Sequence, residues 1–423
     1  MRKRSLPDAI CFWTIALTWP LYGIGALYIV GPVLAWLMTL LALAALYLGP
    51  AAPPGWRAAG PIPPIVWLWI AGMAVMLVAL WVGHLDWGLG TGQTIKSTIG
   101  WAKGWALMAL FPLVGAVLPI RRHSLIRSQT IVGLCTLLVL PIMLVAPMIG
   151  LPEKLFESPL KAAGGPGPEY FSVYLYTLDP STWTPRWQFY APWSPFAGLI
   201  GVVLALFALE EKKRFWMIVG LLAAVAMIYL SKSRMSSVAL VVCVIVPRLL
   251  PFLRQSVAWS VLAAAAASLA VLGTDLLRLM QDGVSAFKGA RADSTRVREA
   301  LQRIAYDRWR TEAVWFGHGT VEPGPHLVER MPIGSHHTWF GLLFVKGLVG
   351  LFALLVPMTV HTLLTFADAT RGPRGRLPLG IMLLLVILSF GENVEIEAYL
   401  LWPALVLLGI HAREMNSPEA SGR

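Results

Sequence analysis

Long blocks of apolar residues, separated by short polar stretches, dominate this sequence. A helix needs about 17–25 mostly apolar residues to cross the hydrocarbon core of a bilayer. Because backbone polar groups inside lipid have to be satisfied within the crossing segment, these blocks predict helices. About twelve membrane spans are expected. They lie near Ile10–Tyr28, Pro32–Leu48, Pro64–Val82, Gly104–Ile120, Ile131–Ile149, Phe196–Leu209, Phe215–Leu230, Val238–Leu250, Val257–Leu272, Trp339–Val360, Leu377–Phe390 and Tyr399–Ile410. The pattern therefore predicts an all-α polytopic membrane protein.

Lysine and arginine are concentrated in alternate predicted loops, and short loops of this type face the cytoplasm. The residues are Arg2, Lys3, Arg4, Arg121, Arg122, Arg127, Lys212, Lys213, Arg214, Arg248, Arg254, Arg371, Arg374 and Arg376. With about twelve spans, all of them lie on one side together with both termini. The opposite short loops, residues 29–31 and 391–398, carry no lysine or arginine. We therefore expect both termini in the cytoplasm.

Three polar regions then fall on the far side of the membrane. These are residues 150–195, 231–237 and 273–338. Residues 273–338 form the longest loop, and an amphipathic helix is expected within it near residues 295–315, with Asp293 or Ser294 as its cap. Since neither an internal repeat nor a soluble domain is visible, residues 1–423 are predicted to form a single transmembrane domain with an extracytoplasmic helical loop as its cap.

The expected helix of this loop has two different sides. Val297, Leu301 and Ala305 lie on an apolar side, whereas Arg296 and Arg303 recur seven residues apart on another side. The arginines are candidates for supporting contacts to a phosphate-bearing substrate. Alternatively, they pair with nearby carboxylates and with lipid phosphates.

Composition narrows the possible partners. Only 13% of the residues are charged and 57% are hydrophobic, whereas about a quarter of a soluble domain is charged. The net charge of +12 fits cytoplasmic loops on anionic membrane lipids and can also attract an anionic lipid-linked substrate. Nucleic acid is a poor candidate, because no basic soluble domain exists to bind it. Cys11, Cys135 and Cys243 all lie in apolar segments with no disulfide or zinc spacing, so no cofactor is expected.

Two arginines are the best candidates for binding a phosphate group. Arg234 lies in a very short polar break between two apolar blocks, and Arg186 closely precedes another block. A charged side chain close to the membrane interior is costly and is usually paired or functional. Arginine's planar fork suits a diphosphate better than lysine's point charge. Alternatively, Arg234 reaches toward lipid headgroups, and Arg186 anchors the chain at the interface.

Histidines supply the best candidate for a proton acceptor. Four of the eight histidines, His318, His326, His336 and His337, share one loop before a predicted span. Imidazole is the usual general base near neutral pH, and His337 directly precedes the span, so it is the candidate base, with His336 in support. The alternative for both is capping a helix or lying at the interface. No metal site is expected, because the spacing of the four matches no zinc pattern.

Acidic and nucleotide-binding candidates are few. Glu392 lies in the segment GENVEIE at the far-side end of a predicted span, where it can orient a histidine or form part of a solvated turn. No Gly-rich nucleotide loop and no nucleophile elbow is present, which argues against a nucleotide-sugar donor.

These pieces resemble the O-antigen ligase and polymerase superfamily of membrane glycosyltransferases. In the family's order they are Arg186 before a span, Ser233-Arg234 at the start of a later span, an arginine-containing helix from Ser294–Arg298 to Gly317-His318-Gly319, and His337 opening a helix that reaches Gly347-Leu348-Val349-Gly350-Leu351. The resemblance covers Arg186–Pro357. The family usually has asparagine after the histidine, whereas Thr338 follows it here.

The resemblance implies a metal-independent glycosyl transfer at the periplasmic face of the bacterial inner membrane. The donor would be a glycan on undecaprenyl diphosphate, and the acceptor of a ligase would be a sugar of lipid A–core. Arg186 and Arg234 would stabilise the diphosphate leaving group, and His337 would accept the proton of the acceptor hydroxyl. The configuration at the anomeric carbon would invert, because no covalent intermediate would form.

Three other functions stay open at this point. A polysaccharide polymerase would use the same donor and a second lipid-linked glycan as acceptor. A transporter or flippase for lipid-linked glycans is expected to show broken helices with polar residues at mid-span and an internal repeat. A scaffold subunit of an envelope complex would need none of the candidate residues.

Overall fold

The computed structural model of the protein describes residues 4–179, 182–256, 260, 292–328 and 330–416. Helices make up most of this part of the chain. The α-helices are α1 (Leu6–Ala16), α2 (Thr18–Gly23), α3 (Leu27–Leu48), α4 (Pro64–Asp86), α5 (Gly90–Lys103), α6 (Leu107–Val117), α7 (Arg122–Val145), α8 (Ser194–Ala208), α9 (Arg214–Leu230), α10 (Arg234–Leu249), α12 (Ala292–Glu312), α13 (Thr338–Arg371), α14 (Arg376–Ser389) and α15 (Val394–Met415). Short 3-10 helices occupy Gly49–Ala51, Pro159–Ala163, Pro168–Phe171, Leu250–Arg254, His326–Val328 and Pro373–Gly375.

Seven helical segments of the described chain are long and apolar enough to cross a membrane. They are Leu27–Ala51, Pro64–Asp86, Gly90–Val117, Arg122–Val145, Arg234–Arg254, Thr338–Arg371 and Val394–Met415. The helices α1, α8 and α9 are apolar but shorter. The predicted all-α, multi-pass membrane fold is therefore confirmed, whereas the predicted number of spans is not. The ninth predicted span, Val257–Leu272, lies almost wholly outside the described residues.

The observed helices differ from the predicted spans in several places. The structure has an additional helix, α5, in a segment that was expected to be a loop. Its mixed sequence GTGQTIKSTIGWAK carries little apolar signal, but the indole N–H of Trp101 donates to the Met73 carbonyl of α4 at 3.0 Å and helps to hold the helix in place. The helix α13 extends to Arg371, well beyond the expected end at Val360.

The centre of the fold is a close crossing of α6 and α15, which is buried over most of its length. Gly115 of α6 and Gly409 of α15 make the crossing possible. A Cβ atom on Gly115 would lie 2.0 Å from the Val406 carbonyl oxygen, and one on Gly409 would lie 2.0 Å from the Pro112 carbonyl oxygen. Small residues let helix backbones approach closely in membranes, where dispersion contacts rather than the hydrophobic effect drive helix association.

The helix α13 is broken near its start, at Gly347, whose φ of 61° and ψ of −159° are not helical. The preceding loop fills the break. The His318 N–H donates to the Phe344 carbonyl at 2.8 Å, and the Gly319 N–H donates to the Val345 carbonyl at 2.9 Å. Irregular backbone is tolerated at membrane depth only where protein satisfies its polar groups, and this loop does so.

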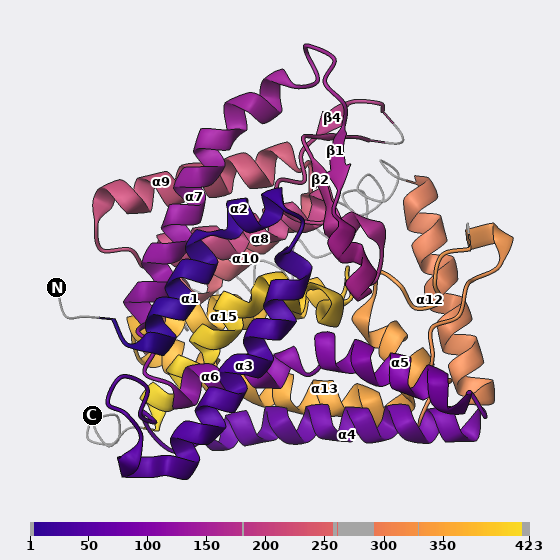
Figure 1. Cartoon of the computed structure of the whole chain (residues 1–423), viewed down its shortest axis with the longest axis horizontal. Helices are drawn as coiled ribbons and strands as arrows, with labels where there is room; N and C mark the ends of the chain where they lie inside the picture. The colour runs from indigo at the N-terminus through magenta and orange to yellow at the C-terminus, as the bar shows by residue number, and fades with distance from the viewer. Residues whose placement is uncertain (1–3, 180–181, 257–259, 261–291, 329, 417–423) are drawn as a thin grey trace.

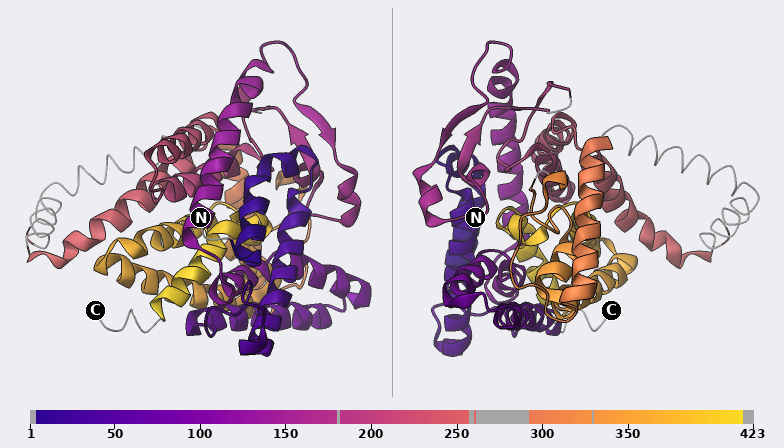
Figure 2. Two further views of the ribbon diagram at one scale, coloured as in Figure 1. Left: turned by 60° about the vertical axis from the view of Figure 1, so that its left-hand side comes forward. Right: turned by 90° about the vertical axis from the view of Figure 1, so that its right-hand side faces the viewer.

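The described residues also form two small antiparallel strand pairs. The strands are β1 (Lys154–Glu157) paired with β2 (Ser172–Tyr174), and β3 (Thr177–Leu178) paired with β4 (Pro185–Arg186). In Figure 1, α1 begins and α15 ends toward the left, whereas α12 lies at the right-hand edge and the hairpins lie at the top. Figure 2 shows α12 in front when that right-hand side faces the viewer.

The helix α12 has the two sides that its sequence predicts. Leu301 and Ala305 are fully buried, and Arg296 and Arg303 are exposed. The helix ends at Glu312, three residues before the predicted end.

Candidate functional site

Arg234 occupies the first turn of α10. The hydroxyl of Ser233 caps this helix by accepting a hydrogen bond from the Ser236 N–H at 3.3 Å. The sequence predicted a span that begins at Val238. The helix instead begins at Arg234, so the arginine is part of the helix rather than of the loop before it. The positive end of the helix dipole and an exposed guanidinium group therefore face the same side. Both favour an anion at this position.

Arg186, the second predicted arginine, lies beside the turn that leads into α10. The Trp187 N–H donates to the Leu230 carbonyl at 3.2 Å. The ammonium group of Lys232 donates to the Thr184 hydroxyl at 2.7 Å. These two hydrogen bonds join β4 to the α9–α10 turn, so two segments that are far apart in the sequence carry Arg186 and Arg234 to one region.

The guanidinium group of Arg186 also has a partner in the segment between β3 and β4. Its Nη1 atom lies 3.2 Å from Oδ2 of Asp179, and only 17% of the arginine side chain is exposed. The carboxylate offsets part of the charge of Arg186 and fixes the orientation of its fork.

The start of α10 also meets the loop between α14 and α15. A Cβ atom on Gly391 would lie 2.5 Å from the sulfur of Met235, the neighbour of Arg234. Glu392 directly follows Gly391, and its Oε2 atom lies 3.5 Å from Nδ1 of His336. The first turn of α10, this loop and the histidine pair before α13 are thus linked through direct contacts.

His337 is the N-cap of α13. Its Nδ1 atom accepts a hydrogen bond from the Phe340 N–H at 3.4 Å, and its own N–H donates to Oδ1 of Asn393 at 3.2 Å. Only 8% of the residue is exposed. Burial lowers the pKa of the His337 imidazole below its ordinary value of 6.5, because a charged ring loses its hydration there. The ring is therefore neutral at physiological pH.

Thr338 forms further hydrogen bonds between the histidine pair and the loop that joins α14 to α15. Its hydroxyl donates to the Glu392 carbonyl at 2.7 Å and accepts from the Val394 N–H at 3.0 Å. Thr338 is only 2% exposed, so water cannot replace these bonds. This residue stands where the family pattern has asparagine.

An apolar groove of about 600 Å³ begins at His337. It follows α13 and α14 into the membrane-spanning part of the molecule. Among its lining residues are His337, Phe340, Leu343, Leu355, Val386 and Phe390. A long hydrocarbon chain fits such a surface, because each buried methylene contributes about 0.8 kcal/mol.

Residues 219–355 match the family model described as O-Antigen ligase. This match covers about a third of the chain and supports membership of the O-antigen ligase superfamily. The matched family is one of glycosyltransferase-like ligases and polymerases. A search of curated proteins and a search of solved structures each found no match.

Some of the candidate residues lie inside the segment that matches the O-antigen ligase family model, and others lie outside it. Arg234, His336 and His337 fall inside the matched segment, whereas Arg186 and Glu392 fall outside it. The contacts between these residues thus come from the tertiary structure and extend beyond the matched segment.

Another histidine of the same loop, His318, has structural contacts. The ring of His318 stacks on Phe344 with centroids 4.3 Å apart, and its Nε2 atom lies 2.8 Å from Oε2 of Glu312. This carboxylate is also paired with Arg308, whose hydrogen bond lowers the pKa of Glu312. His318 thus anchors α12 at the break of α13.

The remaining predicted residues lie apart from the histidine pair. Arg296 and Arg303 are on the exposed face of α12, turned away from the side that packs on the rest of the protein. Among the described residues, no group of three histidine, cysteine, aspartate or glutamate side chains is arranged to hold a metal ion.

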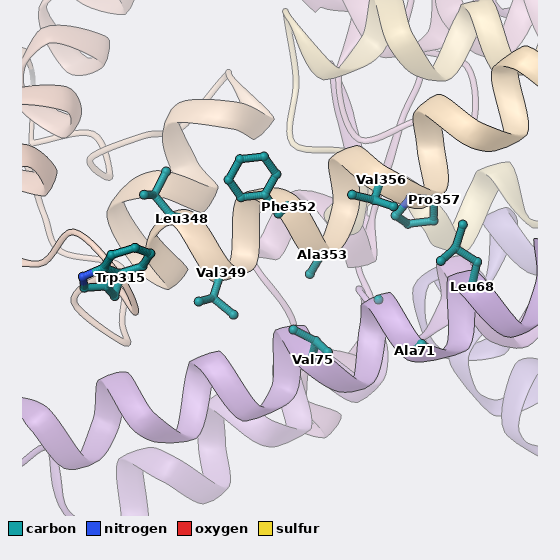
Figure 3. A pocket seen from close by; sticks show the side chains of 11 residues that line it. Leu68, Ala71, Val75, Trp315, Leu348, Val349, Phe352, Ala353, Val356 and Pro357 are labelled. Carbon is teal, nitrogen blue, oxygen red and sulfur yellow. The ribbon is translucent and has the colours of Figure 1, made fainter.

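A second groove, of about 400 Å³, lies between α4 and another face of α13. Figure 3 shows its apolar lining, with Val75 on α4, Phe352 and Val356 on α13, and Trp315 at one end. None of its lining residues carries a titratable group, so it offers no chemistry to a reacting substrate.

The sequence did not identify Asn393 or the role of Thr338. Asn393 directly follows Glu392, but no local pattern relates it to a histidine 56 positions earlier. The only available signal was the departure from the family pattern at Thr338.

Proposed function

We propose that this protein is an O-antigen ligase that transfers a glycan from undecaprenyl diphosphate to a sugar of lipid A–core at the periplasmic face. One observation carries the proposal. The segments with Arg186 and Arg234 join the segment with the histidine pair through a continuous set of contacts, and an apolar groove starts at that pair.

The diphosphate of the donor is the natural ligand of the two arginines. The transition state places negative charge on the leaving diphosphate, and guanidinium groups with a helix N-terminus stabilise that charge. Arg234 is exposed at the first turn of α10, where it can approach such a group. Arg186 lies on the adjoining strand, with its fork held by Asp179. No step of this scheme needs a metal ion.

The lipid part of the donor fits the groove along α13 and α14. A polyprenyl chain is apolar throughout, and so is nearly all of the groove below His337. The groove would hold the carrier lipid with its diphosphate at the end where the histidines and arginines gather.

An acceptor hydroxyl of lipid A–core then attacks the anomeric carbon from the side opposite the diphosphate, and an imidazole of the His336–His337 pair accepts its proton. Direct displacement inverts the configuration at this carbon. The active site faces the periplasm and both termini lie in the cytoplasm, consistent with the distribution of lysine and arginine in the loops.

Reconstitution of the purified protein in liposomes tests the proposal. A diphosphate-linked glycan is supplied with lipid A–core or, separately, with more carrier-linked glycan as the only acceptor. A single modified lipid A–core product supports ligation, whereas a ladder of longer carrier-linked chains would show a polymerase. Movement of the glycan across the bilayer without a new bond would show a transporter. Full activity in excess chelator is expected, and loss that zinc restores would contradict a metal-independent reaction.

A further inference from the structure

The groove between α4 and α13, which we call the α4–α13 groove, is a second apolar track on the helix that follows the histidine pair. Its lining on α13 includes Leu348, Phe352 and Val356, whereas the groove along α13 and α14 (the α13–α14 groove) is lined by Leu351 and Leu355. Since residues four positions apart share one face of a helix, the two grooves lie on adjacent faces of α13. A transferase whose donor and acceptor are both lipids needs two such tracks.

Small residues form the floor of the α4–α13 groove. A Cβ atom on Gly72 would lie 2.3 Å from the Ala353 carbonyl oxygen, so the two helix backbones nearly touch there. Val75, Phe352 and Val356 stand beside this floor and are 44%, 52% and 44% exposed (Figure 3). Because lipid tails are as apolar as leucine, such a groove selects a hydrocarbon chain by its shape and its dispersion contacts rather than by the hydrophobic effect.

The two grooves begin at different depths along α13. The α13–α14 groove begins at His337, whereas the α4–α13 groove has Trp315 and Leu348 at its end. The Val349 N–H donates to the Trp315 carbonyl at 3.1 Å and fixes this end. Leu348 lies eleven positions after His337, which is about 16 Å along a helix. A lipid in the α4–α13 groove therefore needs a spacer between its hydrocarbon chain and the group that reacts at the histidines.

The lengths of the grooves also differ. The α13 lining of the α4–α13 groove runs from Leu348 to Pro357, about 14 Å of helix, whereas that of the α13–α14 groove runs from His337 to Leu363. A polyprenyl carrier is long, and its diphosphate directly follows the chain. The acyl chains of lipid A are shorter, and sugars separate them from the acceptor hydroxyl. The shorter and deeper groove thus matches lipid A–core better than a second carrier-linked glycan.

The charges near the end of the α4–α13 groove suit the same lipid. Trp315 follows α12 by three residues, and indole rings favour the membrane interface. The Trp309 N–H donates to the Val314 carbonyl at 2.9 Å and holds the end of α12 to this turn. Arg303 and Arg310 lie seven positions apart on the exposed side of α12. The guanidinium fork binds phosphate well, and the diglucosamine of lipid A carries phosphate groups.

We propose that the α4–α13 groove holds an acyl chain of the acceptor lipid A–core, with the phosphates of lipid A at the arginine side of α12. This inference rests on the proposed function and specifies how its acceptor is held. The carrier lipid of the donor occupies the α13–α14 groove, so the two substrates reach the histidine pair along adjacent faces of one helix. The α4–α13 groove contributes to binding of the acceptor and not to the chemical step.

A tryptophan at residue 71 fills the groove and leaves the histidines and the donor groove unaltered. Ala71 lines the α4–α13 groove, whereas Ala74 is exposed on the same helix outside that lining. In liposomes, Ala71→Trp is expected to raise the KM for lipid A–core about tenfold, the loss that about ten missing carbon–carbon contacts produce. The KM for the donor and kcat are expected to stay unchanged, and Ala74→Trp is expected to match wild type. Equal KM values for the acceptor in both variants, or a higher KM for the donor in Ala71→Trp, would overturn the proposal.

Photo-crosslinking identifies the bound lipid without depending on transfer. A photoreactive amino acid replaces Val75 in the groove or Ala74 outside it, in vesicles of phosphatidylethanolamine that contain a small fraction of lipid A–core and of undecaprenyl phosphate. Lipid A–core is expected to be enriched in the crosslinks from residue 75 relative to those from residue 74. The same lipid composition at both positions would show that ordinary bilayer lipid fills the groove, and enrichment of undecaprenyl phosphate would assign it to the carrier. Either result would overturn the proposal.

Arg310→Gln tests the contact to the phosphates in the same vesicles. It is expected to lower the enrichment of lipid A–core at residue 75, because glutamine has no charge to pair with a phosphate. Unchanged enrichment would exclude Arg310 from the lipid A site. Wild-type protein is assayed for transfer in parallel. Enrichment without transfer would refute the proposed function and not the groove, whereas transfer without enrichment would refute the occupant of the groove alone.

Discussion

Replacement of Thr338 by valine isolates the contact that joins the histidine pair to the loop between α14 and α15. Valine has nearly the shape of threonine but has no hydroxyl. The substitution removes a hydrogen bond to the Glu392 carbonyl at 2.7 Å and one from the Val394 N–H at 3.0 Å. Since Thr338 is 2% exposed, both backbone groups are left without a partner. Each such group costs about 1–3 kcal/mol, so we expect the free energy of unfolding to fall by about 2–6 kcal/mol.

Denaturant titration in detergent micelles measures that loss. Thr362→Val is the matched control on the same helix, because the Thr362 hydroxyl only donates to the Met358 carbonyl one turn earlier, at 2.7 Å. The control should change the free energy of unfolding by less than about 0.5 kcal/mol. Transfer by Thr338→Val at a temperature where it is folded should fall at least tenfold, because the loop no longer fixes the histidines. Stability within 0.5 kcal/mol of the control would refute the reasoning.

Three further predictions follow from the structure. Arg234→Lys should lower kcat about 10- to 100-fold in the transfer assay, because an ammonium group cannot form two parallel bonds to a diphosphate. Arg214→Lys, at the first residue of α9, is the control, and equal activity of the two variants would contradict the role of Arg234. Gly409→Ala should prevent accumulation of folded protein, measured by gel filtration, because its Cβ atom would lie 2.0 Å from the Pro112 carbonyl oxygen; a stable monodisperse variant would be the opposing result. Burial lowers the pKa of His337 in the folded protein, so the unfolded chain binds the proton more readily as pH falls below about 6.5, and stability is lost toward acid pH. His337→Asn should flatten the resulting fall of the thermal midpoint between pH 7 and pH 5. An unaltered dependence of the thermal midpoint on pH would exclude His337 as its source.

Much of the fold was predictable because its signals are local. The lengths of apolar blocks predicted most of the helices, and the spacing of Leu301 and Ala305 predicted the buried side of α12. His337 was predicted to open a long helix, and it is the N-cap of α13. The additional helix α5 was missed because its polar composition carries a weak signal, and its place beside α4 depends on contacts such as that of Trp101.

The candidate site was predictable only in part. Residue type and position near a span singled out Arg234, His336 and His337, and no rule of local sequence relates them to Glu392 or Asn393. The role of Arg186 in the transfer stays a prediction, although the structure places its strand against the turn before α10.

The sequence by itself determined that this chain is a helical membrane protein and showed its resemblance to the O-antigen ligase superfamily, since span length and residue chemistry are properties of short segments. The tertiary structure alone decided which buried polar groups form hydrogen bonds with each other. Thr338 reaches a carbonyl 54 positions away, and the loop before α13 fills the break at Gly347. Such contacts arise because buried polar groups must find partners wherever the packed helices supply them, and that supply depends on the whole fold.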